Sequence, residues 1–154
     1  MISERKRARQ TGRGRTPPFL LLQHDITSSP EWAALSAKAV KLLIEIARQF
    51  RGYNNGDLSA PWSKMKLRGF RSPQTLHNAK QELIEAGFVV VARQGGMHGC
   101  TLFAVTWMPI DECGGKLDRL AERVASNAWK KSRAQYEVRT APKETDTKSV
   151  RAAA

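Results

Sequence analysis

Four polar side chains recur at helical spacing within RSPQTLHNAKQELIEAGF, residues 71–88, and they are Gln74, His77, Asn78 and Gln81. On a wheel of about 100° per residue, this polar face lies opposite the apolar residues Leu76, Ala79 and Leu83. An amide side chain both donates and accepts hydrogen bonds, whereas lysine only donates and glutamate only accepts. Such a group can bind N7 and N6 of adenine in the DNA major groove. The face therefore predicts base contacts, and the alternative is a solvated helix face that is rich in amides.

Positive charge precedes this helix in the sequence. Residues 59–81 contain five cations and no acidic residue. Lys80 lies inside the helix, and the other four come before it: Lys64, Lys66, Arg68 and Arg71. We expect these four side chains to bind DNA phosphates, and the unpaired N–H groups at the start of the helix add a place for an anion. The segment 25–57 is nearly balanced in charge, so the predicted positive surface lies at one end of the folded part.

Capping residues predict the helices around this face. Ser72 and Pro73 mark the start of a helix over 72–86, and Gly87 marks its end. A short helix is expected before it, over about 60–68. Its predicted core residues are Met65, Trp62 and Leu67. An earlier helix is expected after Ser36, because apolar residues recur there every three or four positions.

The hydrophobic period changes from 3.6 to 2 after the third helix. Residues 88–94 and 100–107 are strand-like, and the glycine-rich loop 95–99 between them predicts a β-hairpin. A short extended piece is expected at 57–58. The order is then helix, short strand, helix, tight turn, helix and hairpin, which is typical of a winged helix-turn-helix domain, an α+β and mainly helical fold. Arg93 lies at the hairpin and is expected to bind a phosphate or the minor groove.

The composition favours a nucleic-acid partner. The chain has 154 residues and a formal net charge of +12, which predicts binding to nucleic acid first and to anionic lipid second. No apolar run approaches the roughly 20 residues of a membrane span. Two cysteines are too few for a disulfide framework. We therefore expect a cytoplasmic protein that has no membrane partner.

Three parts are expected along the chain. Residues 1–18 form a basic arm that is too polar to bury a core and is expected to be disordered. Residues 19–112 form the winged helix-turn-helix domain. Residues 113–154 form a C-terminal extension with a helix over about 116–130, followed by a disordered tail. The arm either follows DNA phosphates or enters a minor groove, as arms of other DNA-binding proteins do, or it is a solubilising tail.

The chain offers little for catalysis or metal binding. His98, Cys100 and Cys113 lack the paired spacing of a structural zinc site. No serine, cysteine or carboxylate has recognisable catalytic partners, and no Gly-Lys-Ser/Thr phosphate loop is present. We therefore expect no enzyme activity, no metal and no cofactor.

Several segments are also familiar in combination: GRGRTPPF, SPEWAALSAKAVKLL, GYNNGDLSA, GFRSPQTLHNAKQELIEAGF, RQGG and TWMPIDEC. Together, over about residues 12–118, they resemble a family of winged helix-turn-helix DNA-binding proteins from prophages, plasmids and integrative elements. The resemblance implies a winged-helix fold and DNA binding in replication or regulation. It also implies DNA contacts at four positions of the third helix: Ser72, Gln74, Thr75 and Asn78. The chain after Asp118 matches no part of that family.

The sequence thus predicts a sequence-preferring, double-stranded DNA-binding protein of a mobile element, with a role in transcription regulation or replication. The third helix would enter the major groove, and Ser72 and Thr75 would join the cations on phosphates. Replication proteins and a second copy of the chain are further expected partners. Two alternatives stay open: a winged-helix adaptor that recruits a replication protein, and an RNA-binding protein, for which only Phe103 and Trp107 could stack on bases.

Overall fold

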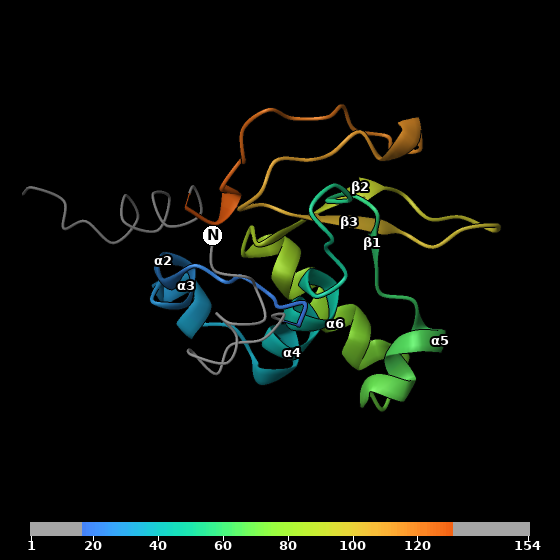
Figure 1. The fold of residues 1–154 in the computed structure, drawn as a ribbon. Helices are drawn as coiled ribbons and strands as arrows, with labels where there is room; N and C mark the ends of the chain where they lie inside the picture. Colours follow the sequence, from blue (N-terminus) through green and yellow to red (C-terminus); the bar gives the residue numbers. More distant parts are fainter. Residues whose placement is uncertain (1–16, 131–154) are drawn as a thin grey trace, which may run out of the picture.

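Two longer helices and a small sheet form the centre of the fold (Figure 1). The computed structural model describes residues 17–130, so most of the predicted arm and the end of the extension lie outside the described residues. The elements are α2 His24–Thr27, α3 Pro30–Ala33, α4 Ala37–Ala47, β1 Leu58–Ser59, α5 Trp62–Met65, the 3-10 turn η1 Lys66–Arg68, α6 Pro73–Glu85, β2 Val89–Arg93, β3 Leu102–Val105 and the 3-10 turn η2 Cys113–Gly115.

Serine side chains cap the two longer helices, as predicted. The hydroxyl oxygens of Ser36 and Ser72 each accept a hydrogen bond from the backbone N–H three residues further on, at 3.2 and 3.1 Å. Pro73 occupies the first position of α6, where the missing N–H would have had no helical partner. Gly87 follows α6 with φ 78°, a left-handed conformation that favours glycine. These helix ends are therefore determined by local sequence.

The three strands form an antiparallel sheet in the order β1-β3-β2. Phe103 of the central strand pairs with Leu58 on one side and with Val91 on the other. The predicted hairpin is confirmed, although its second strand begins at Leu102 rather than at residue 100. The chain is thus an α+β fold, and none of the described helices is long and apolar enough to cross a membrane.

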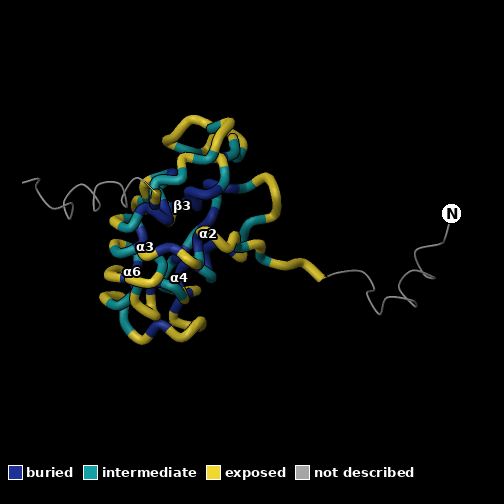
Figure 2. The backbone as a smooth tube through the Cα atoms, turned by 90° about the vertical axis from the view of Figure 1, so that its left-hand side faces the viewer, coloured by how far each residue is buried: buried dark blue, intermediate teal, exposed yellow. Residues whose placement is uncertain are grey.

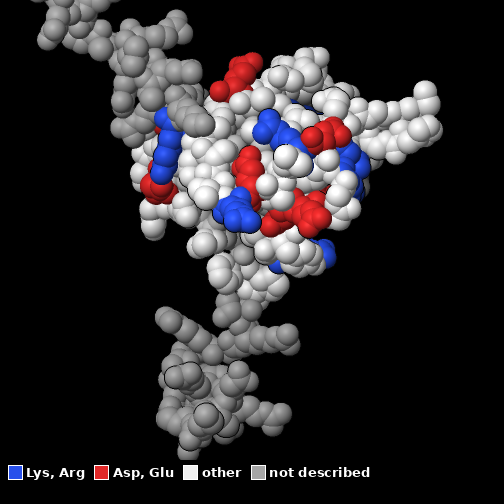
Figure 3. All heavy atoms as spheres, turned by 90° about the horizontal axis from the view of Figure 1, so that it is seen from above, with Lys and Arg blue, Asp and Glu red and all other residues white. Residues whose placement is uncertain are grey.

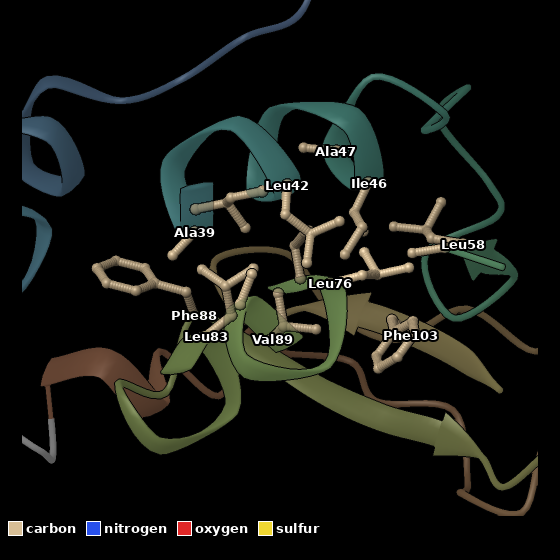
Figure 4. Close-up of a cluster of buried hydrophobic side chains, with 14 of the residues drawn as sticks. Ala39, Leu42, Ile46, Ala47, Leu58, Leu76, Leu83, Phe88, Val89 and Phe103 are labelled. Atoms are coloured by element: carbon tan, nitrogen blue, oxygen red, sulfur yellow. The ribbon is translucent and has the colours of Figure 1, made fainter. Parts of the chain in front are cut away.

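The main core lies between α4, α6 and one face of the sheet, where the buried parts of the backbone gather (Figure 2). Its side chains meet from all three elements, and among those labelled in Figure 4 are Ala39, Leu42, Ile46, Leu76, Leu83, Val89 and Phe103. Met65 is buried and Trp62 packs partly buried against the core, as predicted. Leu67 is 81% exposed, so its predicted core role is wrong. It lies two positions after Met65 and therefore points to the other side of the turn.

The helix predicted over about 116–130 is wrong. Residues 116–127 are not helical, and helix begins only at Ala128. We call residues 116–130 the strap, because they run along the side of the sheet that faces away from α4 and α6 (Figure 1). Asp118 N donates to Ala92 O of the edge strand β2 at 3.0 Å. An edge strand has unpaired backbone N–H and C=O groups, which favour pairing with another segment. In residues 116–127 this pairing outweighs the helix propensity of the segment.

The strap ends on the main core through Trp129. The Trp129 ring stacks on Phe88 with 6.0 Å between ring centroids, and Trp32 meets the same phenyl ring edge-on at 6.2 Å. Two apolar residues of the strap, Leu120 and Val124, are exposed. The strap is therefore anchored by Trp129, by its backbone and by polar side-chain contacts of Lys116, Asp118 and Arg119.

Candidate nucleic-acid interface

The outward side of α6 carries the residues predicted to contact bases. All four are exposed, and we call them the amide face: Gln74, His77, Asn78 and Gln81. The opposite side of α6 is buried against α4 and the sheet through Leu76, Ala79 and Leu83. The flank of α6 is held by Glu82, whose carboxylate accepts hydrogen bonds from the N–H and the hydroxyl of Ser36 at 2.5 and 2.7 Å. The helix thus presents a row of hydrogen-bonding groups from a rigid support.

Two side chains of the amide face are joined. Gln74 Nε2 donates to Asn78 Oδ1 at 2.7 Å, across one turn of α6. The bond leaves the Gln74 carbonyl oxygen as an acceptor and the Asn78 amide N–H groups as donors. The two amides therefore present an acceptor and a donor side by side as one linked pair.

Arg68, predicted to bind phosphate, is held by Glu45 of α4. Its Nη2 lies 2.8 Å from Glu45 Oε1, and its Nε lies 3.0 Å from each carboxylate oxygen. The same buried carboxylate accepts a hydrogen bond from Arg48 at 2.8 Å. The hydrogen bonds from Arg68 lower the pKa of Glu45 although burial opposes the shift, and Glu45 raises the pKa of Arg68. Arg68 therefore fastens η1 to α4, and only its remaining N–H groups are open to a phosphate.

The other cations before α6 are exposed, and they are Lys64, Lys66 and Arg71. In the described part of the chain, no carboxylate lies within 4.0 Å of them. Two cations of α4, which the sequence analysis did not select, join them at the turn before α6. Lys38 Nζ lies 6.0 Å from the centroid of the Phe70 ring, and Lys41 Nζ lies beside Gly69. Charge counting does not single out these two lysines, because segment 25–57 has nearly equal numbers of basic and acidic residues. Their spacing of three residues nevertheless places them on the same side of α4.

The hydroxyl groups predicted to bind phosphate take part in the start of α6. Ser72 Oγ and Thr75 Oγ1 lie 2.8 Å apart, and Ser72 Oγ also caps the helix. Both residues are half-buried. The structure thus places Ser72 and Thr75 at the N-terminal end of α6, where backbone N–H groups favour an anion.

In the hairpin between β2 and β3, the Arg93 side chain reaches from the end of β2 to the segment that leads into β3. Arg93 Nη2 donates to Cys100 O at 3.4 Å. Gly95 packs so closely that a Cβ there would lie 2.4 Å from Thr101 N. Met97 in the loop is exposed, and the loop between β2 and β3 extends away from the rest of the domain (Figure 1). The guanidinium of Arg93 therefore lies at the base of a narrow, projecting loop.

The side of the sheet that carries the strap has a different charge pattern. Figure 3 views the molecule from this side and shows acidic and basic side chains intermingled. Lys116 Nζ lies 2.6 Å from Asp57 Oδ2, and the Asp118 carboxylate accepts a hydrogen bond from Gln94 N at 2.8 Å. Among the described residues, five cations without a carboxylate within 4.0 Å lie near α5, η1 and the turn that leads into α6: Lys38, Lys41, Lys64, Lys66 and Arg71. Arg119 and Arg123 of the strap also lack such a partner within residues 17–130.

The cysteines and histidines do not form a metal site in the part of the chain that the structure describes. Within residues 17–130, no three His, Cys, Asp or Glu side chains come together in a way that could hold a metal ion. Cys100 is exposed, whereas Cys113 is partly buried, and its burial raises the pKa of its thiol.

Comparison of the chain with protein-family models, with curated proteins and with solved structures finds no match.

Proposed function

We propose that the chain is a sequence-preferring, double-stranded DNA-binding protein that inserts α6 into the major groove. The observation that carries this proposal is the exposed amide face on a helix whose other side is buried. An α-helix fits the major groove, and amide groups can distinguish base pairs there. The exposed cations near the start of α6 supply the sequence-independent part of the affinity.

The order of the elements supports a winged helix-turn-helix arrangement. Helix α4, strand β1, helices α5 and α6 and the β2–β3 hairpin follow one another, and the hairpin extends the sheet to which β1 belongs. In such a domain the third helix reads the major groove while the hairpin, the wing, lies against the backbone or in the minor groove. Arg93 at the base of the hairpin is then a phosphate or minor-groove contact.

The contacts fall into two groups. Gln74, Asn78 and Gln81 would bind base edges, with His77 beside them. Phosphates would be bound by Lys64, Lys66, Arg71, Ser72, Thr75 and Arg93, and by the free N–H groups of Arg68. The resemblance to DNA-binding proteins of prophages, plasmids and integrative elements supports a role in replication or transcription regulation in such an element.

Two other functions are less well supported. RNA binding through stacked bases would need exposed aromatic rings, but the two rings predicted for it, Phe103 and Trp107, are only 3% and 6% exposed. The exposed rings of Phe19 and Tyr53 lie outside the sheet. A protein adaptor would need a contact surface, and Leu67 is one exposed apolar side chain that favours it. Leu67 lies among the exposed cations of η1, where an apolar contact area is small.

The test is a titration of a labelled duplex with the full chain at two salt concentrations. The logarithm of the affinity should fall linearly with the logarithm of the salt concentration, with a slope of about −0.9 for each phosphate neutralised. Competition with unlabelled duplex DNA should displace the probe more effectively than competition with RNA. A chain that binds no duplex, or that prefers RNA, contradicts the proposed function.

A further inference from the structure

Lys80 has an unusual setting for a lysine on an otherwise exposed part of α6. It is half-buried, and its Nζ lies 5.8 Å from the centroid of the Phe103 ring. Phe103 belongs to the central strand β3 and is itself buried. Lys80 therefore lies on the side of α6 that turns toward the sheet and its hairpin, next to the amide face.

The charge of Lys80 is poorly compensated by the protein itself. In the described range 17–130, no carboxylate lies within 4.0 Å of its ammonium group. Burial lowers the pKa of Lys80, because the ammonium group loses part of its hydration. The face of an aromatic ring compensates for only part of this loss. A half-buried cation of this kind gains from an anion that approaches its open side.

DNA brings an anion to this place if α6 lies in the major groove. The major groove and the neighbouring minor groove are separated by one phosphodiester backbone. When a helix occupies the first groove and a hairpin reaches toward the second, that backbone must pass between them. Lys80 is the cation that α6 turns toward this gap, and Arg93 stands on the hairpin side.

We propose that Lys80 is a phosphate-binding residue that holds the DNA backbone between α6 and the β2–β3 hairpin. This inference rests on the proposed function and adds a contact that neither the charge pattern before α6 nor the family resemblance assigns. The ammonium group acts as a compact point charge for one phosphate. Its partly desolvated state strengthens the pairing, because water competes less for it.

The experiment compares Lys80→Met, Lys80→Arg and Lys130→Met in the full chain, with a mixed-sequence duplex as the probe. Lys130 is the control, because its Nζ also lies over a ring, 5.1 Å from the centroid of Trp129, but it is exposed, lies in the strap and pairs with Asp25 at 3.4 Å. Lys80→Met should weaken binding about fivefold at roughly 0.15 M salt and reduce the salt slope by about 0.9, the effect of one lost phosphate contact. Lys80→Arg should keep most of the affinity, and Lys130→Met should match the wild type.

A stability measurement separates phosphate binding from a structural role. Lys80→Met should unfold at the same temperature as the wild type or higher, because it removes a half-buried charge that has no carboxylate partner among the described residues. The inference about Lys80 is overturned if Lys80→Met binds the duplex with the wild-type salt slope. It is also overturned if the substitution lowers both stability and affinity while the salt slope stays unchanged. In both cases the proposed function stands. If the wild type itself shows no salt-dependent binding, both are overturned.

Discussion

Arg68 of η1 donates hydrogen bonds to both carboxylate oxygens of Glu45 in α4, a partner 23 positions earlier in the chain. The pair fastens η1, which leads into the turn before α6, to α4. Glu45 is buried, and the hydrogen bonds from Arg68 keep its pKa below the ordinary value despite that burial. A group whose pKa differs between the folded and the unfolded chain makes stability depend on pH.

We expect Glu45→Gln to lower the melting temperature at about pH 7 and to have less effect as the pH falls. A carboxylate with a lowered pKa in the fold contributes stability that is fully present above its unfolded pKa, near 4.5. This stability is lost as the pH falls through the lower folded value. Thermal unfolding, followed by circular dichroism from about pH 7 down to about pH 3, measures the difference.

Glu85→Gln is the control for this change, because Glu85 is an exposed carboxylate of α6. Its substitution should shift the melting temperature little across the same pH range. If the difference in melting temperature between the wild type and Glu45→Gln stays the same at low pH, the charge of Glu45 is not the source of the stability.

Asn55 is expected to be a strong determinant of stability. It is completely buried, and its Nδ2 donates to the carbonyl oxygens of Val105, Met108 and Pro109 at 2.9–3.0 Å, while its Oδ1 accepts from Val105 N at 2.9 Å. Asn55→Ala leaves these buried backbone groups without partners. We expect a loss of about 3 kcal/mol in the free energy of unfolding, measured by urea denaturation.

The neighbouring Asn54→Ala is a matched control. Asn54 is half-buried, and its side chain makes two hydrogen bonds, to Arg51 N and Gln49 O. Asn54→Ala should lower the free energy of unfolding by about 1 kcal/mol, because water can replace part of the hydrogen bonding of the Asn54 amide. If Asn54→Ala and Asn55→Ala lower the free energy of unfolding equally, burial of the amide does not determine its contribution to stability.

The local features of this fold could be predicted from the sequence. Capping serines, helix-ending glycines and the change of period after α6 each act within a few residues, so the main helices and the hairpin are where they were expected. The exposure of Gln74 and Asn78 follows from helical geometry once Leu76 and Leu83 are buried. Periodicity carries this information because each helix has only one buried side.

Features that depend on distant parts of the chain could not be predicted. The strap was expected to be a helix. Its conformation instead depends on pairing with the edge strand β2 and on the stacking of Trp129 on Phe88. The bond between Glu45 and Arg68 links segments that no local pattern connects. The sequence therefore predicted the exposed amide face but not Lys38 and Lys41 at the turn before α6, nor the ion pair that fastens η1 to α4.

Trp129 makes the strap part of the folded domain, and this can be tested. Its ring is buried and stacks on Phe88. Trp129→Ala would leave a cavity beside that ring, and we expect it to lower the free energy of unfolding by about 3 kcal/mol. Leu120→Ala is the control in the same segment, since Leu120 is 90% exposed and should change stability by less than about 0.5 kcal/mol. No loss in Trp129→Ala would mean that the strap does not contribute to the core.

The amide face makes the most direct prediction about sequence preference. A duplex selected from random sequences and a scrambled duplex of the same length are compared in binding titrations. Gln74→Ala and Asn78→Ala should each reduce the difference in binding free energy between the two duplexes by about 1–3 kcal/mol, the contribution of one bidentate base contact. Lys66→Ala should weaken binding to both duplexes by the same factor, about fivefold at roughly 0.15 M salt, because it removes only a phosphate contact.

The hydrogen bond between Gln74 and Asn78 adds a sharper expectation. In the proposed complex the two amides bind a base edge as a linked pair, so removing either one should disturb the other, and the double substitution should cost less binding free energy than the sum of the single ones. Gln81→Ala combined with Lys66→Ala is the additive reference, since a base contact and a phosphate contact act independently. If Gln74→Ala, Asn78→Ala and Lys66→Ala all weaken the two duplexes equally, then α6 binds DNA without reading its bases.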